Sequence, residues 1–328
     1  MKKKRKLLIK NGIFITEKCL FFDYYLVIQD NVIWWVMIAI DWGTTNFRAY
    51  YLSMNKDNKM LENNNKGVKF IEGDKFEDVI LDLFKQHFFL YDLNNRFVGM
   101  SGMIGSKNGW IEVPYLYGSV NLEDIKKSLY SFTLSNGIPA FIVPGIAMIN
   151  KYGIFDVMRG EETQLLGLYK MTKGDDLSVI LPGTHSKHAS IQFGKLVDFC
   201  TLMTGELFSL LDQYSILTKG MPSFYNDESA FLKGVEIGNE IPLSNALFST
   251  RTLFLNQQIS SNQVRSYLSG IIIGNEIRLL PKDLNHYVVG SENIVKRYTN
   301  ALKYLGYRHQ VVDGEHCFLA GIESMVSD

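Results

Sequence analysis

The chain has few cysteines, no net charge and no long apolar run. Its 328 residues contain three cysteines, Cys19, Cys200 and Cys317, and no two of them have Cys-x-x-Cys spacing. This usage argues against a disulfide framework or a zinc site and predicts a reduced, cytoplasmic protein. The 34 basic and 34 acidic residues give a formal net charge of zero. Neither a nucleic acid nor an acidic membrane is therefore indicated as a partner.

The first 36 residues lack the pattern of a targeting segment. They open with a basic run, Lys2 to Lys6, and further charges interrupt the apolar stretches that follow. A signal peptide needs an uninterrupted apolar core, and a membrane helix needs about 20 apolar residues. We expect residues 1–36 to be an appendage or a mis-assigned start, with Met37 as the true initiator. A weak basic surface anchor is the alternative.

The most informative segment follows directly. An apolar run from Met37 to Ile40 predicts a buried strand that ends in Asp41. The next residues form a small polar turn, which contains Gly43, Thr44, Thr45 and Asn46. Glycine permits close backbone approach, hydroxyl and N–H groups donate to phosphate, and a carboxylate holds magnesium through water. Because a second strand follows rather than a helix, this is a hairpin and not the Gly-Lys-Ser/Thr phosphate loop.

A second hairpin repeats this construction. Ser178 to Leu181 is an apolar strand, Gly183 and Thr184 lie in the turn, and His188 to Phe193 alternates as an outgoing strand. One such turn is weak evidence, because most of them only reverse the chain. Two of them, one in each half, predict a duplicated architecture with a nucleotide clamped between the halves.

Several motifs make a family resemblance specific. They are Ile40–Asn46, Gly99–Ser106, Val157–Gly167, Leu181–Lys187, Met203–Leu207, Tyr267–Gly274 and Ala320–Ile322. With them the chain resembles the 2-dehydro-3-deoxygalactonokinase family, in the sugar-kinase branch of the actin/hexokinase/Hsp70 ATPase superfamily, from about Met37 to the C-terminus. The resemblance implies an α/β, two-domain actin-like (ribonuclease H-like) ATPase fold, with a duplicated mixed β-sheet domain and an interdomain cleft. It also implies ATP and Mg²⁺ as cofactors.

The expected organisation has three parts. Residues 1–36 are the extension, residues 37–155 the first actin-like domain, and residues 156–328 the second, with the adenosine side. Apolar spacing predicts helices over Phe76–Phe89, Glu161–Lys170 and Gly205–Leu217, the last with Thr204 as N-cap, and strands over Arg96–Gly99 and Pro139–Val143. A Gly/Ser-rich loop is expected over residues 99–109.

Phosphoryl transfer to a hydroxyl needs a group for magnesium, donors for the developing charge and a carboxylate base. Asp41 is the candidate residue for holding magnesium. The alternative is an aspartate that only caps the turn at the end of the strand. Related sugar kinases place an Asp at the start of the first helix of the second domain, where this chain has Glu161 and Glu162. Which glutamate is the base stays open. Helix N-termini also favour acids through the helix dipole alone.

Candidate sugar-binding residues lie in two places. Arg159 precedes the glutamates and is suited to bind a substrate carboxylate bidentately, with a structural salt bridge as the rival interpretation. A loop of the first half offers polar groups and an indole for a sugar, through Ser101, Ser106, Asn108 and Trp110. The alternative is an ordinary surface loop.

The second half adds further candidates. His185 and Lys187 flank the second turn, where Lys187 is suited to meet a phosphate or the substrate acid, while a lone histidine is more often structural. Gly290, Ser291 and Asn293 resemble the adenosine-side turn of the superfamily, although any strand–Gly–helix junction looks similar.

The resulting function is an ATP-dependent kinase that phosphorylates the 6-hydroxyl of 2-dehydro-3-deoxy-D-galactonate in galactonate catabolism. The resemblance supplies this substrate, because the motifs alone indicate only ATP and transfer to a hydroxyl. The alternatives are a kinase of another hexonate or ketose and a non-catalytic nucleotide-binding sensor of the same fold. The expected partner is a small sugar acid, without nucleic acid or membrane, and a homodimer is left open.

Overall fold

The computed structural model describes residues 8–10, 13–18, 25–29, 32–34, 36–53, 58–87, 96–172, 174, 176–222 and 226–326. The chain forms two compact units. The first comprises Met1–Ala147, Val157–Met171 and Phe318–Asp328, and the second Met148–Asp156 and Thr172–Cys317. Within the described residues, no helix has the length and apolarity to cross a membrane.

The N-terminal extension contains a small antiparallel sheet. Its four strands lie in chain order, β1 (Leu8–Lys10), β2 (Ile13–Lys18), β3 (Tyr25–Gln29) and β4 (Val32–Trp34).

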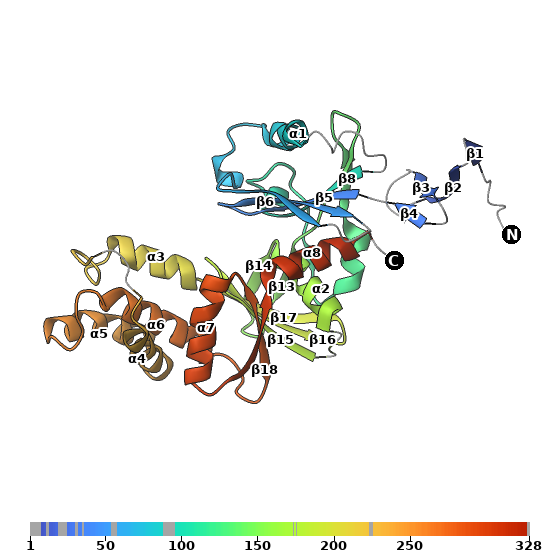
Figure 1. Cartoon of the computed structure of the whole chain (residues 1–328). Helices are drawn as coiled ribbons and strands as arrows, with labels where there is room; N and C mark the ends of the chain where they lie inside the picture. Colours follow the sequence, from blue (N-terminus) through green and yellow to red (C-terminus); the bar gives the residue numbers. More distant parts are fainter. Residues whose placement is uncertain are drawn as a thin grey trace. The chain divides into compact units, whose positions relative to one another are not determined.

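The main sheet of the first unit has the order β11-β12-β8-β5-β6-β7, of which Figure 1 labels β5, β6 and β8. These strands are β5 (Val36–Trp42), β6 (Phe47–Ser53), β7 (Lys59–Asn64), β8 (Arg96–Gly102), β11 (Tyr130–Thr133) and β12 (Pro139–Ile142). The apolar run of β5 is fully buried, and the strand pairs antiparallel with β6 and parallel with β8. The predicted first hairpin is therefore confirmed.

Helix α1 (Phe76–Gln86) covers this sheet with the apolar face that its spacing predicts. Phe76 also packs edge-on against Trp42, at a ring-centroid distance of 5.7 Å. The end of the predicted helix beyond His87 lies outside the described residues. Strand β8 runs on to Gly102, so the loop expected from Gly99 begins later. The reason is that the β5 ladder continues to the Trp42–Gly102 pair.

Helices α2 (Glu161–Thr172) and α8 (Gly314–Ser324) show why the compact units do not follow chain order. A Cβ on Gly321 would lie 1.9 Å from the carbonyl oxygen of Thr163, so the two backbones are in direct contact. Residues 157–171 and 318–328 consequently belong to the first unit, although the sequence places them in an expected second domain that begins at residue 156.

The sheet of the second unit repeats the same arrangement. Its strands run in the order β17-β16-β15-β18-β19. They are β15 (Asp176–Leu181), β16 (Ser186–Gln192), β17 (Lys195–Leu202), β18 (Asn285–Gly290) and β19 (Arg308–Asp313). Strand β15 pairs antiparallel with β16 and parallel with β18, as β5 pairs with β6 and β8. The second predicted hairpin is thus confirmed.

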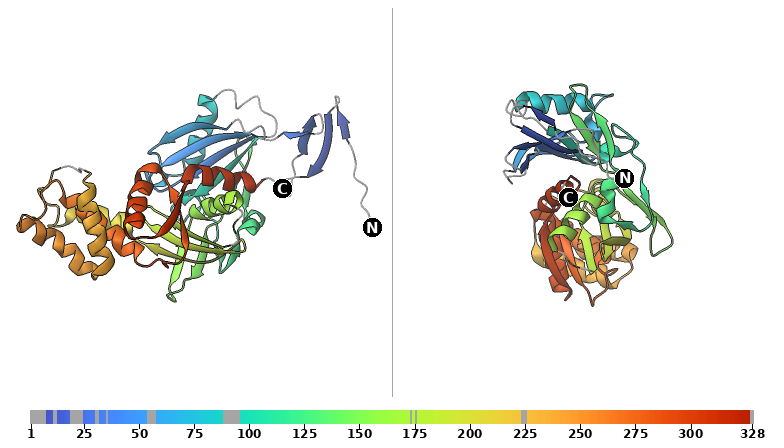
Figure 2. Two further views of the ribbon diagram at one scale, coloured as in Figure 1. Left: turned by 60° about the horizontal axis from the view of Figure 1, so that its bottom comes forward. Right: turned by 90° about the vertical axis from the view of Figure 1, so that its right-hand side faces the viewer.

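Five further helices lie wholly within the described residues of the second unit. They are α3 (Thr204–Tyr214), α4 (Glu228–Glu240), α5 (Leu243–Leu255), α6 (Val264–Ile277) and α7 (Glu292–Tyr304). Figure 2 shows α4, α5 and α6 grouped together, and α4 and α6 touch through glycines. A Cβ on Gly270 would lie 2.0 Å from the carbonyl oxygen of Phe231, and one on Gly238 would lie 2.0 Å from that of Ile271.

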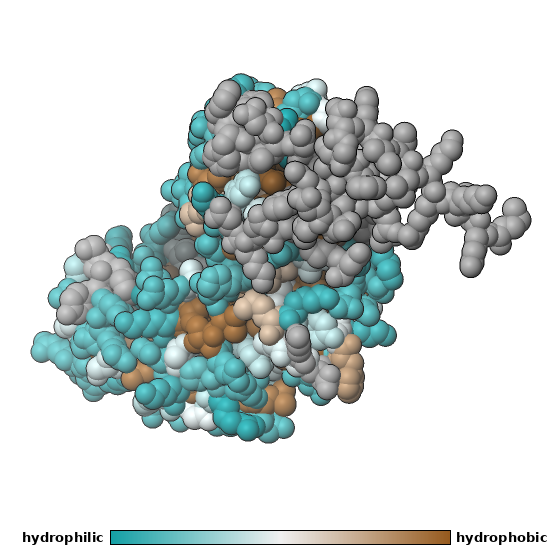
Figure 3. Space-filling view, turned by 45° about the vertical axis from the view of Figure 1, so that its right-hand side comes forward, coloured by the Kyte–Doolittle hydropathy of each residue, from teal (hydrophilic) through white to brown (hydrophobic). Residues whose placement is uncertain are grey.

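The remaining elements are short. They are β9 (Leu116–Tyr117), β10 (Val120–Asn121), β13 (Ile146–Ile149), β14 (Phe155–Met158) and the 3₁₀ turns η1 (Val68–Phe70), η3 (Met103–Gly105) and η4 (Leu122–Ser128). One face of the molecule is largely hydrophilic, with separate apolar patches (Figure 3).

Helix α3 corrects one expectation, because Met203 and not Thr204 occupies its N-cap position.

Candidate active site

The first Gly-Thr turn is held by hydrogen bonds from residues 67–69. The carbonyl oxygens of residues 43–45 accept hydrogen bonds of 2.9–3.2 Å from the backbone N–H groups of residues 67–69. A Cβ on Gly67 would lie only 2.2 Å from the Thr45 carbonyl carbon, so no other residue permits this approach. The side chains of residues 44–46 are exposed and form no hydrogen bond with the described residues. Their donors are consequently available for a phosphate.

Asp41 lies beside this turn in a partly buried, charged environment. Burial raises the pKa of Asp41; the Arg48 guanidinium, 3.5 Å from its carboxylate, opposes this shift, and the charge of Glu161 reinforces it. A cation would relieve the repulsion between the two carboxylates. The described residues contain no group of three or more His, Cys, Asp or Glu side chains placed to hold a metal. Magnesium is commonly held by one or two carboxylates, phosphate oxygens and water, a donor set that the carboxylate of Asp41 fits.

Glu162 is an internal anchor of helix α2. Its side chain is fully buried, and Oε2 accepts a 2.7 Å hydrogen bond from the N–H of Gly160. Gly160 has a φ of 110°, which favours glycine at this position. Oε1 accepts from the hydroxyl groups of Ser101 and Thr163, each at 3.3 Å. Burial, reinforced by Glu161, raises the pKa of Glu162 to about 7.

Glu161 has different surroundings. It is the first residue of α2, is only partly buried, and its Oε2 accepts a 3.1 Å hydrogen bond from the backbone N–H of Arg159. Its charge raises the pKa of both Asp41 and Glu162, so the three carboxylates interact within the first unit. Glu161 is therefore the glutamate that combines proximity to Asp41 with an accessible surface.

Arg159 carries a buried guanidinium with unused donors. The residue is 8% exposed, and Nη2 donates a 2.7 Å hydrogen bond to the carbonyl oxygen of Val113. Nε and Nη1 are buried and have no hydrogen-bond partner among the described residues. The guanidinium also lies over the ring of Tyr115, 4.3 Å from its centroid. A buried cation with unused donors is costly unless an acceptor arrives, and a carboxylate is the matching acceptor.

The structure separates the four predicted loop residues of the first half. Ser101 is fully buried on β8, and its Oγ lies 2.7 Å from Thr163 Oγ1, which removes it from any surface. Ser106 uses its Oγ to donate to the carbonyl oxygen of Met103 at 2.7 Å. Asn108 is exposed, and the half-buried Trp110 packs edge-on against Phe132. Asn108 and Trp110 keep a surface on which a sugar could bind.

The second Gly-Thr turn is fastened to the start of α3. A Cβ on Gly205 would lie 2.5 Å from the carbonyl oxygen of Gly183, and the N–H of Glu206 donates to Thr184 at 3.0 Å. His185 Nε2 lies 2.5 Å from Glu206 Oε2. His185 is thus part of the scaffold of this turn, and Glu206, to which the sequence assigned no role, is its partner.

A buried polar network continues behind this turn. The carboxylate of Glu276, on α6, accepts from Tyr298 at 2.7 Å, from His188 at 3.0 Å and from Thr204. Tyr298 also hydrogen-bonds Ser186 at 3.1 Å, so β16, α3, α6 and α7 are joined. Sequence reasoning missed this network. Its only signal was a single acid within the apolar run of α6.

Lys187 lies on β16 with its side chain almost completely buried. It is 5% exposed, and its Nζ donates to the carbonyl oxygen of His185 at 3.4 Å. This hydrogen bond keeps the ammonium group close to the second turn, where a phosphate is expected. The candidate sugar-binding residues of the first unit are distant from Lys187 in the sequence.

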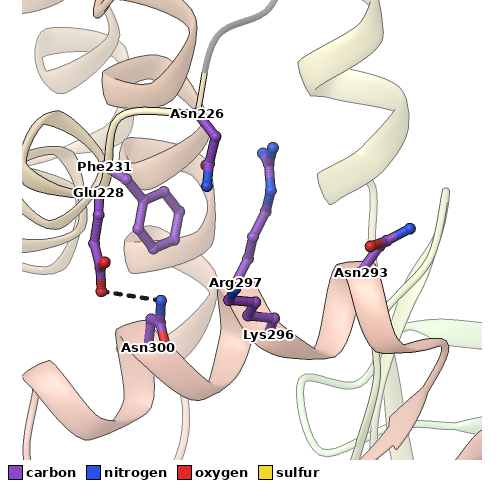
Figure 4. A pocket seen from close by; sticks show the side chains of 7 residues that line it. All are labelled: Asn226, Glu228, Phe231, Asn293, Lys296, Arg297 and Asn300. Carbon is purple, nitrogen blue, oxygen red and sulfur yellow. Dashed lines mark hydrogen bonds between the residues drawn. The ribbon is translucent and has the colours of Figure 1, made fainter.

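Two adjoining pockets lie beside this network. One, of about 240 Å³, is bounded by Gly183 and Gly205 and has an apolar wall that includes Ile272, Ile273 and Ile294. The other, of about 310 Å³, is polar and is shown in Figure 4, with Asn300 donating to Glu228 at 3.2 Å. Asn293 and Arg297 line both pockets. Of the three predicted adenosine-side residues, Asn293 reaches a pocket, and Gly290 and Ser291 form the junction that leads into α7.

Comparison with known proteins identifies the family. A sequence model of the 2-keto-3-deoxy-galactonokinase family matches residues 41–325. The chain belongs to this family. It is an enzyme of the kinase class that uses a nucleotide, and the α/β fold with mixed sheets that the sequence implied is confirmed. The match begins after the N-terminal extension.

Individual members of the family agree over most of their length. The chain is 32% identical over 295 residues to the 2-dehydro-3-deoxygalactonokinase of Escherichia coli (strain K12), covering 88% of this chain and 96% of that protein. It is 30% identical over 302 residues to a Rhizobium meliloti (strain 1021) protein named for the same activity, covering 87% and 95%. A crystal structure assigned to this activity, from Sinorhizobium meliloti, has a TM-score of 0.78 at 28% identity, covering 89% and 95%.

Proposed function

We propose that this kinase transfers the γ-phosphoryl group of ATP to the 6-hydroxyl of 2-dehydro-3-deoxy-D-galactonate, with Mg²⁺ as cofactor. The observation that carries the substrate assignment is the guanidinium of Arg159, which is buried with two donors lacking an acceptor. A sugar acid supplies the missing carboxylate, whereas a neutral ketose leaves a buried cation unpaired. The names of the similar E. coli and R. meliloti proteins specify the same substrate.

The nucleotide would be bound by groups of three kinds. The two turns, residues 43–46 and 183–184, offer backbone and hydroxyl donors to its phosphates. The pocket bordered by Asn293 and the isoleucines of α6 suits an adenosine, because it has an apolar wall and few polar groups. Asp41 would hold Mg²⁺ through water; the ion, when bound, neutralises charge on the phosphates.

Glu161 is the proposed base. A base must first be within reach of the hydroxyl, and only then does its pKa matter. Glu162 has the raised pKa, but it is fully buried and both of its carboxylate oxygens accept hydrogen bonds from the protein. Glu161 is partly exposed and interacts with Asp41, so it can accept the proton of the sugar hydroxyl while Glu162 fixes the start of α2.

On the sugar side, Arg159 would bind the carboxylate bidentately, and Asn108 and Trp110 would contact the hydroxyl groups and the apolar face. Lys187 would meet a phosphate. A cytoplasmic location and a homodimer complete the proposal. Light scattering of the purified protein tests the homodimer.

The deciding experiment is ATP-dependent phosphorylation, followed by coupled ADP release. The panel contains 2-keto-3-deoxy sugar acids and neutral ketoses, and wild type is compared with Glu161→Gln and Glu162→Gln. We expect turnover of 2-dehydro-3-deoxygalactonate alone, and a loss of kcat of about 10²-fold or more for Glu161→Gln, the lower end for a general base.

Other outcomes favour the alternatives. Preferred turnover of another hexonate or of a ketose would replace the substrate. ADP release without any sugar preference, or no release, would support a nucleotide-binding sensor. Loss of activity in Glu162→Gln with retention in Glu161→Gln would exchange the roles of the two glutamates.

A further inference from the structure

Three neighbours in the first unit contact or closely approach the guanidinium of Arg159. The Tyr115 ring lies over it at 4.3 Å, and the carbonyl oxygen of Val113 accepts from Nη2 at 2.7 Å. On the third side, a Cβ on Gly105 would lie 2.9 Å from Nη1. The plane of the group is therefore set by an aromatic face and a carbonyl, and the space for it depends on the glycine.

The Tyr115 ring is itself fixed. A Cβ on Gly145 would lie 2.7 Å from the ring edge and 2.5 Å from the carbonyl oxygen of Met158. The ring thus rests directly against the Gly145 backbone, which links β12 to β13. The Gly145 backbone therefore limits movement of the ring on that side.

The donors that remain can still form a fork. An arginine has five N–H donors in one plane, and Nη2 carries two of them. Val113 accepts one, and Nε and Nη1 have no acceptor among the described residues. A second Nη2 hydrogen can therefore act together with a neighbouring nitrogen on one carboxylate. The acids close to Arg159 do not take this role: Glu161 accepts from its backbone N–H, and Glu162 interacts with its charge without a hydrogen bond to the guanidinium.

We propose that Tyr115, with Gly105 and Val113, presets the Arg159 guanidinium as a carboxylate receptor, and that Tyr115 thereby sets the selectivity for a sugar acid over a neutral sugar. This inference rests on the proposed function, in which Arg159 binds the substrate carboxylate. Tyr115 acts through Arg159 and is a positioning residue. Without the ring, the guanidinium would have to be ordered by the substrate, which weakens binding of the acid and leaves binding of a neutral sugar unchanged.

The test compares two substrates and four variants, with Arg159→Met as a fifth variant that tests the proposed function itself. The substrates are 2-dehydro-3-deoxygalactonate and the 3-deoxyketohexose in which a hydroxymethyl group replaces the carboxylate. The variants are Tyr115→Leu, Tyr115→Phe, Gly105→Ala and Tyr117→Leu. Tyr117 is the matched control, because it is two residues away and 71% exposed. Steady-state kinetics gives KM and kcat, and calorimetry measures binding of the acid without ATP.

For Tyr115→Leu we expect KM and Kd for the acid to rise about tenfold, within the range of a desolvated cation–π contact, with kcat nearly unchanged. Tyr115→Phe keeps the ring and should restore wild-type values. Gly105→Ala leaves Tyr115 and Arg159 chemically intact but displaces Nη1, so KM for the acid should rise again. Tyr117→Leu should behave as wild type, and kcat/KM for the neutral ketose should be equal in all variants.

Equal losses for the acid and the neutral ketose in Tyr115→Leu would overturn the inference, because they indicate a general structural role. Unchanged acid binding in Tyr115→Leu would overturn it as well. Arg159→Met separates this failure from failure of the proposed function. If Arg159→Met binds the acid as wild type does, or if wild type does not bind the acid, the carboxylate role of Arg159 and the inference that rests on it both fail.

Discussion

Replacing Glu162 by glutamine should change how the stability of the first unit depends on pH. The carboxyl group is fully buried, and its pKa is raised from an ordinary value of 4.5 to about 7, first by burial and second by Glu161. Between these values the folded state binds more protons than the unfolded state. Stability is therefore fully present below pH 4.5 and falls as the pH rises through about 7.

The size of the effect follows from this interval. Each pH unit between the two pKa values corresponds to about 1.36 kcal/mol, so the loss is about 3 kcal/mol at neutral to alkaline pH. Glutamine cannot ionise, and its carbonyl oxygen can still accept from Gly160. We expect the free energy of unfolding of wild type, relative to Glu162→Gln, to decline by this amount between pH 4.5 and about 7.5.

Urea unfolding at a series of pH values measures this difference. The four tryptophans lie within residues 34–110, so their fluorescence follows the unit that contains Glu162. The exposed Glu112 provides the control, because Glu112→Gln should leave the pH dependence of wild type unchanged. Parallel pH curves for wild type and Glu162→Gln would refute the reasoning, because they would mean that Glu162 is solvated in the folded state.

Three further changes test the two turns and the helix packing. Gly67→Ala places a Cβ 2.2 Å from the Thr45 carbonyl carbon, so we expect KM for ATP to rise with little change in KM for the sugar acid, measured by steady-state kinetics. Gly270→Ala forces α4 and α6 apart, and thermal unfolding should show a destabilisation of about 1–3 kcal/mol or more, whereas Ala246→Gly on α5 is a milder comparison. Glu276→Ala leaves the donors of His188, Thr204 and Tyr298 without their acceptor, and a loss of about 3 kcal/mol in urea unfolding is expected; an unchanged midpoint would contradict the network.

Local patterns in the chain were enough to predict the main elements. The apolar runs before Asp41 and before Gly183 became the central strands β5 and β15, because a run flanked by turn residues can bury both faces only inside a sheet. The spacing from Phe76 predicted α1 for the corresponding reason, since residues three and four apart share one face of a helix. Helix α6 packs closely on α4 because glycines of both helices lie at the contact, and this pairing depends on the fold.

The site was predictable only in part. Asp41, Glu161, Glu162 and Arg159 were named from the sequence, and the structure places them in one unit. The different roles of Glu161 and Glu162 depend on burial, which spacing in the sequence does not reveal. The two glutamates are adjacent at the start of α2, but Glu162 is fully buried and Glu161 is partly exposed. Ser101 was expected at a sugar and is instead buried against Thr163, because β8 runs to Gly102, three residues beyond the strand end expected at Gly99.

By itself, the sequence determined the hairpins, the helices and the kinds of side chain available for phosphoryl transfer, because these depend on neighbours along the chain. Only the tertiary structure decided which donors are already used and which are free for a ligand. The carboxylate of Glu276 and the ring of Tyr115 gain their roles from His188 and Arg159, each more than 40 positions away, through contacts that no local pattern encodes. Burial and pairing are properties of the folded chain, and they separate the residues that bind from those that support them.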